Sequence, residues 1–443
     1  MPSASALFRP LRLRLALALA CAGAAALAAF ALAHAANDVD KKGAPAAAPA
    51  PFYATPFERQ PDVPTLTRLG RALFADRVLS ASGRTACISC HDPAHAYGPP
   101  NALAVQLAGP NGREPGLRAV PSLRYSQATP PFSEHFYDAD GNDSEDQGPT
   151  GGFFWDGRAS SAHDQAEGPL LSPFEMANPS RQAVLERLAR SPNAQALRDA
   201  FGARLFDNQQ LAWNALVLSL EVFQQSPADF YPYSSRYDAF LRGQTKLSPT
   251  EMRGLALFND QTKGNCASCH LSGVKRGAFP QFTDQGLIAL GVPRNPAIPA
   301  NRDSKFFDMG LCGPLRTDLK DHPEYCGLFK TPSLRNVATR KVFFHNGVYR
   351  SLEEVMRFYV QRDTNPERFY SRDVRGRVRK YDDLPDPRYS ENVNTDPPFD
   401  RKPGDKPALS EAEIRDVIAF LRTLNDGWKP PSAAPAARAK ASR

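Results

Sequence analysis

A five-residue motif that occurs twice constrains this chain more than any other feature of its sequence. Cys87-Ile-Ser-Cys90-His91 lies in the first half, and Cys266-Ala-Ser-Cys269-His270 lies in the second half. An apolar pattern of the same kind precedes each copy, Gly70-Arg-Ala-Leu73-Phe74 in one case and Gly254-Leu-Ala-Leu257-Phe258 in the other. Two copies this far apart indicate one duplicated unit, because a solenoid would show shorter periods and more copies.

Helix signals surround these motifs. Ser248-Pro249-Thr250-Glu251 combines an N-cap, a proline at the first helical position and a capping-box acid. A serine followed three residues later by a glutamate also opens predicted helices at Ser351 and Ser410, and Asn208 to Phe223 has apolar residues at helical spacing. No segment alternates apolar and polar residues with a period of two. We therefore predict an all-α fold with long loops, in keeping with 41 prolines in 443 residues.

The first 35 residues are typical of an export signal. Arg9, Arg12 and Arg14 precede the apolar run from Leu15 to Ala33, and Ala33-His34-Ala35 fits a cleavage site. An uncleaved membrane anchor is the alternative, although a run so rich in alanine makes a weak spanning helix. We predict cleavage, export to the periplasm, an oxidising environment and no stable membrane insertion of the mature chain.

Composition divides the remaining chain into four segments. Residues 36–60 are rich in alanine and proline and predict a tether, residues 61–243 and 244–428 hold one motif copy each, and residues 429–443 predict a disordered tail. The formal net charge of +7 comes from the two ends, because the signal and the tail contain bases and no acids. The body is close to neutral, which excludes nucleic acid as a partner.

The C-x-x-C-H motif is the attachment signature of a c-type haem. The thiols of Cys87 and Cys90 would bond to the haem edge, and His91 would ligate the iron. The corresponding set in the second copy is Cys266, Cys269 and His270. Zinc binding is the usual alternative for a single such motif in a cytosolic protein. Two copies in an exported chain predict two covalently bound haem c groups in two cytochrome c-like haem domains.

Two further cysteines lie outside the motifs. Cys312 and Cys326 remain once Cys21 is removed with the signal and the other four are used for haem attachment. A disulfide between them is the expected state in an oxidising compartment, and two free thiols are the alternative.

Five further motifs carry a resemblance to a known family. They are Leu69 to Phe74, Phe154 to Arg158, Gly168 to Met176, Phe329 to Val337, and Phe344 to Gly347. The order of these motifs resembles that in the bacterial dihaem cytochrome c peroxidases and, within that superfamily, in the MauG branch. The resemblance extends from Pro61 to about Trp428.

The resemblance implies different tasks for the two haems. The N-terminal haem would react with peroxide at an open distal face, and the C-terminal haem would be six-coordinate and store or relay an oxidising equivalent. Trp155 matches the inter-haem tryptophan, while Gln165, Pro169 and Glu175 match the distal pocket. A carboxyl group in a semi-apolar pocket can move a proton during peroxide activation, so Glu175 is the predicted acid–base group. The alternative for Glu175 is an ordinary exposed glutamate at a helix end. The alternative for Trp155 is a buried tryptophan that only packs a core.

The branch depends on the sixth ligand of the second haem. In this family, scavenging peroxidases supply a methionine and the MauG branch supplies a tyrosine. The resemblance places Tyr359 at the ligand position, and Met356 is the rival because it lies one helical turn earlier on the same face. Methionine raises the iron potential and suits electron uptake, whereas phenolate stabilises higher oxidation states.

Three further expectations follow from the resemblance. His135 is a weak candidate for the distal pocket, and His345 is expected to be structural. Family members commonly bind calcium between the haems, but Arg118-Ala119-Val120-Pro121 and Arg340-Lys341-Val342 replace a side-chain oxygen and add cations at the matching positions. We therefore expect no calcium, or a weak site with Arg340 in its place.

The prediction is a periplasmic dihaem c-type peroxidase of the MauG-like branch. It would use hydrogen peroxide to oxidise a redox partner, namely a small cytochrome, a cupredoxin or a protein substrate. One alternative is a cytochrome c peroxidase that scavenges peroxide with electrons from a small cytochrome or cupredoxin. An alternative from another class is a non-catalytic dihaem electron carrier.

Overall fold

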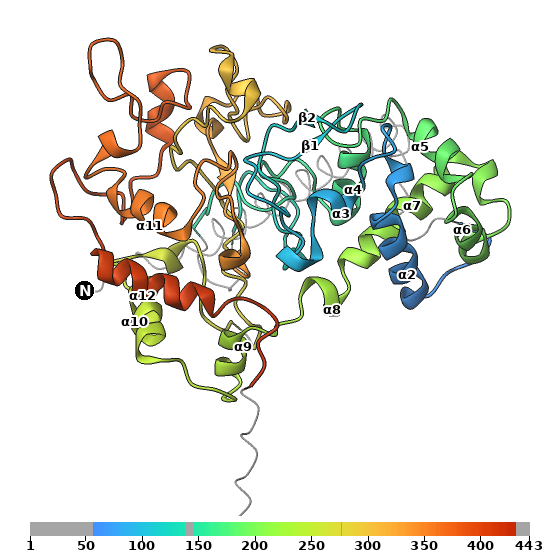
Figure 1. Ribbon diagram of the computed structural model, residues 1–443, viewed down its shortest axis with the longest axis horizontal. Coiled ribbons are helices and arrows are strands. Elements are labelled where there is room, and N and C mark those ends of the chain that lie inside the picture. Colours follow the sequence, from blue (N-terminus) through green and yellow to red (C-terminus); the bar gives the residue numbers. More distant parts are fainter. Residues whose placement is uncertain (1–55, 138–144, 276, 431–443) are drawn as a thin grey trace, which may run out of the picture. The chain divides into compact units, whose positions relative to one another are not determined.

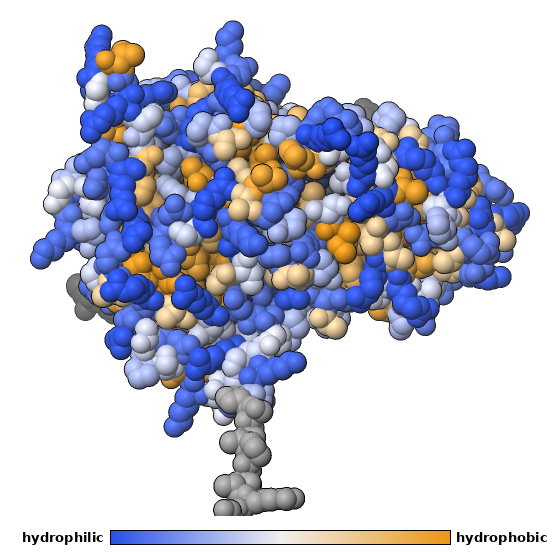
Figure 2. Space-filling model, viewed as in Figure 1, coloured by the Kyte–Doolittle hydropathy of each residue, from blue (hydrophilic) through white to orange (hydrophobic). Residues whose placement is uncertain are grey.

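The computed structural model describes residues 56–137, 145–275 and 277–430. The described residues from Phe57 onward belong to one compact unit. The predicted signal and the tail from residue 431 lie outside the described residues, as do most of the predicted tether and residues 138–144. Within the described ranges, no helix is long and apolar enough to cross a membrane. Hydrophilic residues cover most of the face drawn in Figure 2, with apolar residues scattered between them.

A first group of helices surrounds one apolar core (Figure 1). It comprises α2 (Val63–Phe74), α3 (Cys87–Cys90), α4 (Ala162–Leu171), α5 (Arg181–Leu188), α6 (Ala194–Phe201), α7 (Gln209–Gln224) and α8 (Pro227–Phe230). Asn208 caps α7 through its side chain, as its sequence predicts.

A second group surrounds another core (Figure 1). It comprises α9 (Arg236–Leu241), α10 (Pro249–Asn259), α11 (Leu352–Gln361) and α12 (Glu411–Arg422). Capping boxes at Ser248, Ser351 and Ser410 open α10, α11 and α12, which confirms those three helix predictions. Tyr237 of α9 already packs into this second core, before residue 243, where the sequence predicts the boundary.

Long loops with short elements connect these helices. The 3-10 turns are η2 (Arg77–Leu79), η3 (Pro93–His95), η4 (Leu205–Asp207), η5 (Cys266–Ser268), η6 (Pro299–Arg302), η7 (Pro323–Tyr325), η8 (Val337–Thr339), η9 (Pro366–Arg368) and η10 (Pro387–Asn392). The strands form two antiparallel pairs, β1 (Leu107–Ala108) with β2 (Glu114–Pro115), and β3 (Leu287–Ile288) with β4 (Phe329–Lys330). The fold is mostly helical, and the all-α prediction missed these two-residue strands because so short an element leaves no periodic pattern.

Each core is built on a close crossing of two helices. A Cβ atom added to Gly70 of α2 would lie 1.9 Å from the carbonyl oxygen of Ser219 in α7. One added to Gly254 of α10 would lie 2.0 Å from the carbonyl oxygen of Asp416 in α12. Glycine therefore permits the same backbone contact in both halves, and the two copies of the apolar pattern before the motifs have the same structural role.

Candidate haem cavity

One continuous cavity of about 870 Å³ is lined by both C-x-x-C-H motifs. The motif residues on its wall are Cys87, Cys90, His91, Cys266, Cys269 and His270. The four motif thiols are free. Cys312 and Cys326 form a disulfide and are absent from the cavity wall.

Backbone carbonyls orient the histidine of the first motif. His91 Nδ1 lies 2.9 Å from the carbonyl oxygen of Tyr97, which also accepts the Leu123 N–H at 3.3 Å. The Ser122 hydroxyl donates to the neighbouring carbonyl of Ala96 at 2.6 Å. Because a carbonyl only accepts, Nδ1 carries the proton, and the Nε2 lone pair is available for a metal. Burial lowers the pKa of His91 to about 4, which keeps the ring in this neutral form.

The second motif repeats this arrangement atom for atom. His270 Nδ1 lies 2.9 Å from the carbonyl oxygen of Phe282, which accepts the Leu334 N–H at 3.3 Å. The Ser333 hydroxyl donates to the preceding carbonyl of Gln281 at 2.7 Å. Burial lowers the pKa of His270 in the same way.

A second repeated motif builds the hydrogen-bonded surroundings of the two motif histidines, which we call the histidine cages. This motif was not identified in the sequence analysis. Pro-Ser-Leu-Arg occurs at 121–124 and again at 332–335. Its serine and leucine make the contacts just described, and its arginine N–H donates to the serine hydroxyl at 3.1 Å in the first copy and 3.2 Å in the second. A search for self-similarity beyond C-x-x-C-H would have found it.

The distal residues predicted for the first haem lie together on the cavity wall. Gln165 and Pro169 belong to α4, Glu175 follows that helix, and all three line the cavity. Burial raises the pKa of Glu175, against the opposing effect of the nearby Arg158 cation. An acid with a raised pKa and an apolar surrounding can both take and return a proton near neutral pH.

Trp155 lies where loops from the two halves meet. Its indole Nε1 donates to the carbonyl of Ala119 at 2.7 Å, and its own carbonyl accepts the N–H of Lys330 at 2.8 Å. The side chain is buried and lines the cavity. The ring is thus bonded to a loop of the first half, and the backbone of the same residue is bonded to a loop of the second half.

Both rival ligands of the second haem lie on α11 and line the cavity. Met356 is a buried member of the second core. Tyr359 packs between Phe344 and Phe399, at ring-centroid distances of 6.0 and 5.4 Å. Burial, together with the nearby thiols of the second motif, raises the pKa of Tyr359. Its hydroxyl makes no hydrogen bond within the described residues.

The remaining histidines fall outside this arrangement or at its edge. His135 is 67% exposed, pairs with Asp146 at 2.6 Å and is absent from the cavity wall. His345 does line the cavity and stacks on Phe329 at a centroid distance of 3.6 Å. Burial lowers the pKa of His345 to about 4, and its Nε2 atom has no hydrogen-bond partner within the described residues.

The guanidinium group of Arg340 lies in the region that matches the calcium site of other family members. Arg340 donates to the carbonyl of Val120 at 3.1 Å and to that of Val342 at 3.2 Å. Arg118 is held by Asp156 and Asp308, both at 2.7 Å or less. No group of three or more His, Cys, Asp or Glu side chains in the described part of the chain could hold a metal ion. The expectation about calcium stays a prediction.

The cavity fits two c-type haems. It is lined largely by apolar side chains, it presents two pairs of free thiols, and both motif histidines have Nδ1 on a backbone carbonyl, so that Nε2 is the atom that could ligate iron. A zinc site would need its ligands clustered around one point, whereas these sets line two regions of an extended wall.

Comparisons with known proteins agree with this geometry. A sequence model described as "Di-haem cytochrome c peroxidase" matches residues 64–246. Methylamine utilization protein MauG of Paracoccus denitrificans (strain Pd 1222) is 32% identical over 394 residues, which cover 86% of this chain and 94% of that one. Cytochrome c551 peroxidase of Pseudomonas aeruginosa is 26% identical over 310 residues, covering 70% and 75% of the two chains.

A solved structure agrees as well. The diheme peroxidase BthA from Burkholderia thailandensis E264 matches with a TM-score of 0.72 and 38% identity, over 86% of this chain and 89% of that one. The chain therefore belongs to the dihaem cytochrome c peroxidase family, whose members hold two c-type haems, and it is a MauG-like oxidoreductase that acts on hydrogen peroxide.

Proposed function

We propose that hydrogen peroxide is activated at the N-terminal haem site and that oxidising equivalents pass through Trp155 to a C-terminal haem ligated by His270 and Tyr359. An external donor or a protein substrate is then oxidised. The observation that carries the proposal is the contrast between two matching proximal cages and two unlike distal walls. Glu175 lies near the thiols of the first motif, and Tyr359 lies near the thiols of the second motif.

The haems would be held by the two cysteine pairs and by the Nε2 atoms of His91 and His270, and they would supply redox-active iron. Glu175 performs the proton transfer. It takes a proton from one peroxide oxygen and gives it to the other, which leaves as water. Pro169, which lacks an N–H group, and the apolar wall beside it limit water near the carboxyl group and maintain its raised pKa. Gln165 is positioned to orient peroxide by hydrogen bonding.

Trp155 connects the two sites. An indole can lose an electron, and this one donates a hydrogen bond to a loop of the first half, while the backbone carbonyl of Trp155 accepts one from a loop of the second half. Its burial excludes water from the ring and favours electron transfer over side reactions.

Tyr359 is favoured over Met356 by packing. Met356 is 6% exposed and belongs to the second core, whereas the Tyr359 hydroxyl has no partner within the described residues and is close to the second pair of thiols. A tyrosine-to-methionine variant of BthA has also been solved, at 37% identity to this chain. A phenolate ligand stabilises higher oxidation states of iron and therefore suits storage of oxidising equivalents.

The wider organisation completes the proposal. The two haem domains, residues 61–243 and 244–428, descend from one duplicated unit, as the matching helix crossings and histidine cages support. The mature protein acts in the periplasm, which is the typical location of the family, after removal of residues 1–35.

The test compares two variants of the holoprotein, Tyr359→Phe and Met356→Leu. We expect Tyr359→Phe to convert the second haem to a high-spin or water-ligated spectrum while the haem content stays the same, and Met356→Leu to keep the wild-type spectrum. Retention of the wild-type spectrum in Tyr359→Phe, or its loss in Met356→Leu, would reject Tyr359 as the ligand.

One observation favours a second candidate. Met356 also lines the cavity, so methionine ligation is sterically open. That outcome would make the protein a scavenging peroxidase that takes electrons from a small cytochrome or cupredoxin.

A further inference from the structure

A buried tyrosine, which the proposed function does not use, follows the first Pro-Ser-Leu-Arg turn. Tyr125 is 1% exposed, and its side chain belongs to the wall of the haem cavity. Its hydroxyl donates to Asp426 Oδ1 at 2.7 Å. Burial raises the pKa of Tyr125, so the phenol stays protonated at neutral pH. A phenol can lose an electron readily only if its proton leaves at the same time, and Asp426 is placed to accept that proton.

The matching position in the second half carries a residue that cannot be oxidised in this way. Asn336 follows the second turn with a φ of 61°, against 62° for Tyr125, and it donates to Asp426 Oδ2 at 2.7 Å. The residues after the two turns therefore meet at one carboxylate, which also pairs with Arg124 of the first turn at 3.0 Å. Only the first half, where peroxide would react, has an oxidisable side chain there.

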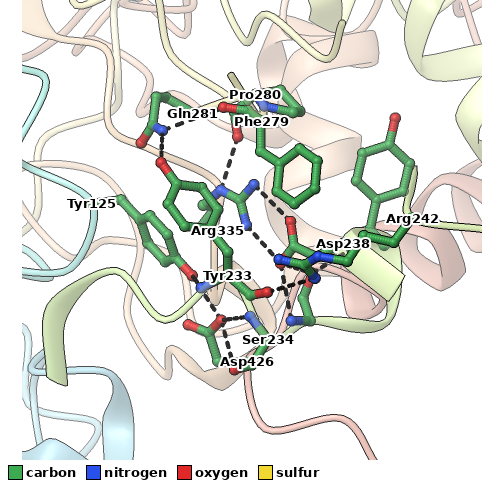
Figure 3. A network of polar contacts seen from close by, with 12 residues as sticks. Tyr125, Tyr233, Ser234, Asp238, Arg242, Phe279, Pro280, Gln281, Arg335 and Asp426 are labelled. Atoms are coloured by element: carbon green, nitrogen blue, oxygen red, sulfur yellow. Dashed lines mark hydrogen bonds and ion pairs between the residues drawn. The ribbon is translucent and has the colours of Figure 1, made fainter. Parts of the chain in front are cut away.

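A second tyrosine, Tyr233, lies beside Tyr125 (Figure 3) and is absent from the cavity wall. The N–H of Tyr233 donates to the hydroxyl of Tyr125 at 3.0 Å, and the two ring centroids lie 5.1 Å apart. Tyr233 is half-buried, so its ring is partly accessible from outside. Its hydroxyl oxygen accepts hydrogen bonds from the side-chain amides of Gln127 and Gln281. These donors can remain in place when the phenolic proton leaves.

Arg335 determines how these rings can be oxidised. Its guanidinium lies 4.6 Å from the ring centre of Tyr125 and 4.7 Å from that of Tyr233, and Asp238 pairs with it at 3.0 Å with both side chains fully buried. A fixed cation against both rings disfavours a positively charged ring. Oxidation must therefore yield a neutral radical with loss of the phenolic proton.

We propose that Tyr125 and Tyr233 form a relay that carries oxidising equivalents from the first haem site to the surface, where a phenolic donor is oxidised. The relay rests on the proposed peroxide chemistry at that site. Tyr125 gives one electron to the oxidised haem site, and its O–H bond breaks as the proton moves to Asp426. Tyr233 then returns an electron to Tyr125, which recovers its proton from Asp426, while Tyr233 releases its own proton to water.

The phenolic donor closes the cycle. It transfers one hydrogen atom to the Tyr233 oxygen and leaves as a phenoxyl radical. Two passages supply the two electrons that reduce one peroxide to two waters, and the protons released to water balance those taken up by peroxide.

The test locates radicals on the holoprotein by covalent trapping. Wild-type protein is mixed with equimolar peroxide and a nitroso spin trap in the absence of donor, and adducts are mapped by peptide mass spectrometry. We expect an adduct on Tyr233. Tyr125→Phe and Asp426→Asn should lose it, with haem content and peroxide consumption retained. The control Tyr231→Phe removes a nearby half-buried tyrosine whose hydroxyl donates to the Gln225 carbonyl, and it should keep the adduct.

Each of the other outcomes rejects either the relay alone or the relay together with the proposed function. The relay is rejected if Tyr125→Phe forms as much Tyr233 adduct as the wild type does. It is also rejected if the wild type consumes peroxide and forms no Tyr233 adduct. Wild-type protein that consumes no peroxide rejects the proposed function together with the relay. If Tyr125→Phe fails to retain haem, Tyr233→Phe decides, because a relay predicts that it slows peroxide-driven oxidation of an added phenol without slowing the reaction of the protein with a first, equimolar addition of peroxide. Equal phenol oxidation in that variant and the wild type overturns the relay.

Discussion

The two haem sites share their proximal sides and differ in their distal sides. In each half a glycine permits a helix crossing, a carbonyl fixes the motif histidine, and a Pro-Ser-Leu-Arg turn donates to that same carbonyl. The hydrogen-bond lengths agree within 0.1 Å between the halves.

The distal sides come from unrelated elements. The first site faces α4 and the segment that ends in Glu175, whereas the second faces α11 with Tyr359 and Met356. A duplicated scaffold thus provides the same covalent attachment and the same histidine ligand twice. Under the proposed function, the elements near each pair of thiols decide which site would admit peroxide and which would be closed by a side chain.

The largest expected effect separates the two attachment sites. Cys87→Ala/Cys90→Ala and Cys266→Ala/Cys269→Ala should each lose one of the two covalent haems, because no thiol remains for attachment. Only the first pair should also abolish the peroxide reaction at a site with an open distal face. The pyridine haemochrome assay and stopped-flow spectra measure both. Full haem content in either double variant would contradict the assignment.

Next in size is the effect of Glu175→Gln, which should slow peroxide activation by about two to four orders of magnitude. The pKa of Glu175 is raised above the ordinary 4.5 by burial, so the proton-accepting carboxylate is lost at a higher pH than for an exposed glutamate. The wild-type rate should therefore fall as the pH is lowered through that raised pKa. The variant should lack this dependence, and the exposed control Glu186→Gln should retain it.

A smaller asymmetry concerns the disulfide, which lies in the second half. Cys312 and Cys326 are 14 residues apart, and closing such a loop stabilises a fold by about 3 kcal/mol through the entropy of the unfolded chain. Cys312→Ala/Cys326→Ala should lower the free energy of unfolding by about that amount in urea titrations. An unchanged free energy of unfolding would show that the bridge does not constrain the second half.

The smallest effect tests the shared scaffold. Gly70→Ala and Gly254→Ala should each destabilise the protein by about 1–3 kcal/mol, because the added methyl group meets a helix carbonyl at about the same distance in both halves. Gly273→Ala is the control, since no atom lies within 4 Å of its added Cβ. Thermal unfolding measures all three. A marked difference between the two crossing variants would mean that the halves do not share this packing.

Local signals in the sequence account for much of what is observed. The capping boxes at Ser248, Ser351 and Ser410 and the two C-x-x-C-H motifs act over a few residues, so a single pass along the chain identifies them. The Pro-Ser-Leu-Arg repeat is equally local, since its two copies can be found by comparing the two halves of the sequence. The two-residue strands were not predictable, because their pairing depends on where distant loops meet.

The sequence by itself determined the helical class, the duplicated attachment motifs and the family, because covalent chemistry and helix capping depend on short spacings. Only the tertiary structure decided which side chains share the cavity. It placed Asp426 against both Tyr125 and Asn336, and it set Arg340 between the carbonyls of Val120 and Val342. Such contacts join residues up to 301 positions apart, and they form only because the packing of the whole unit brings those segments together.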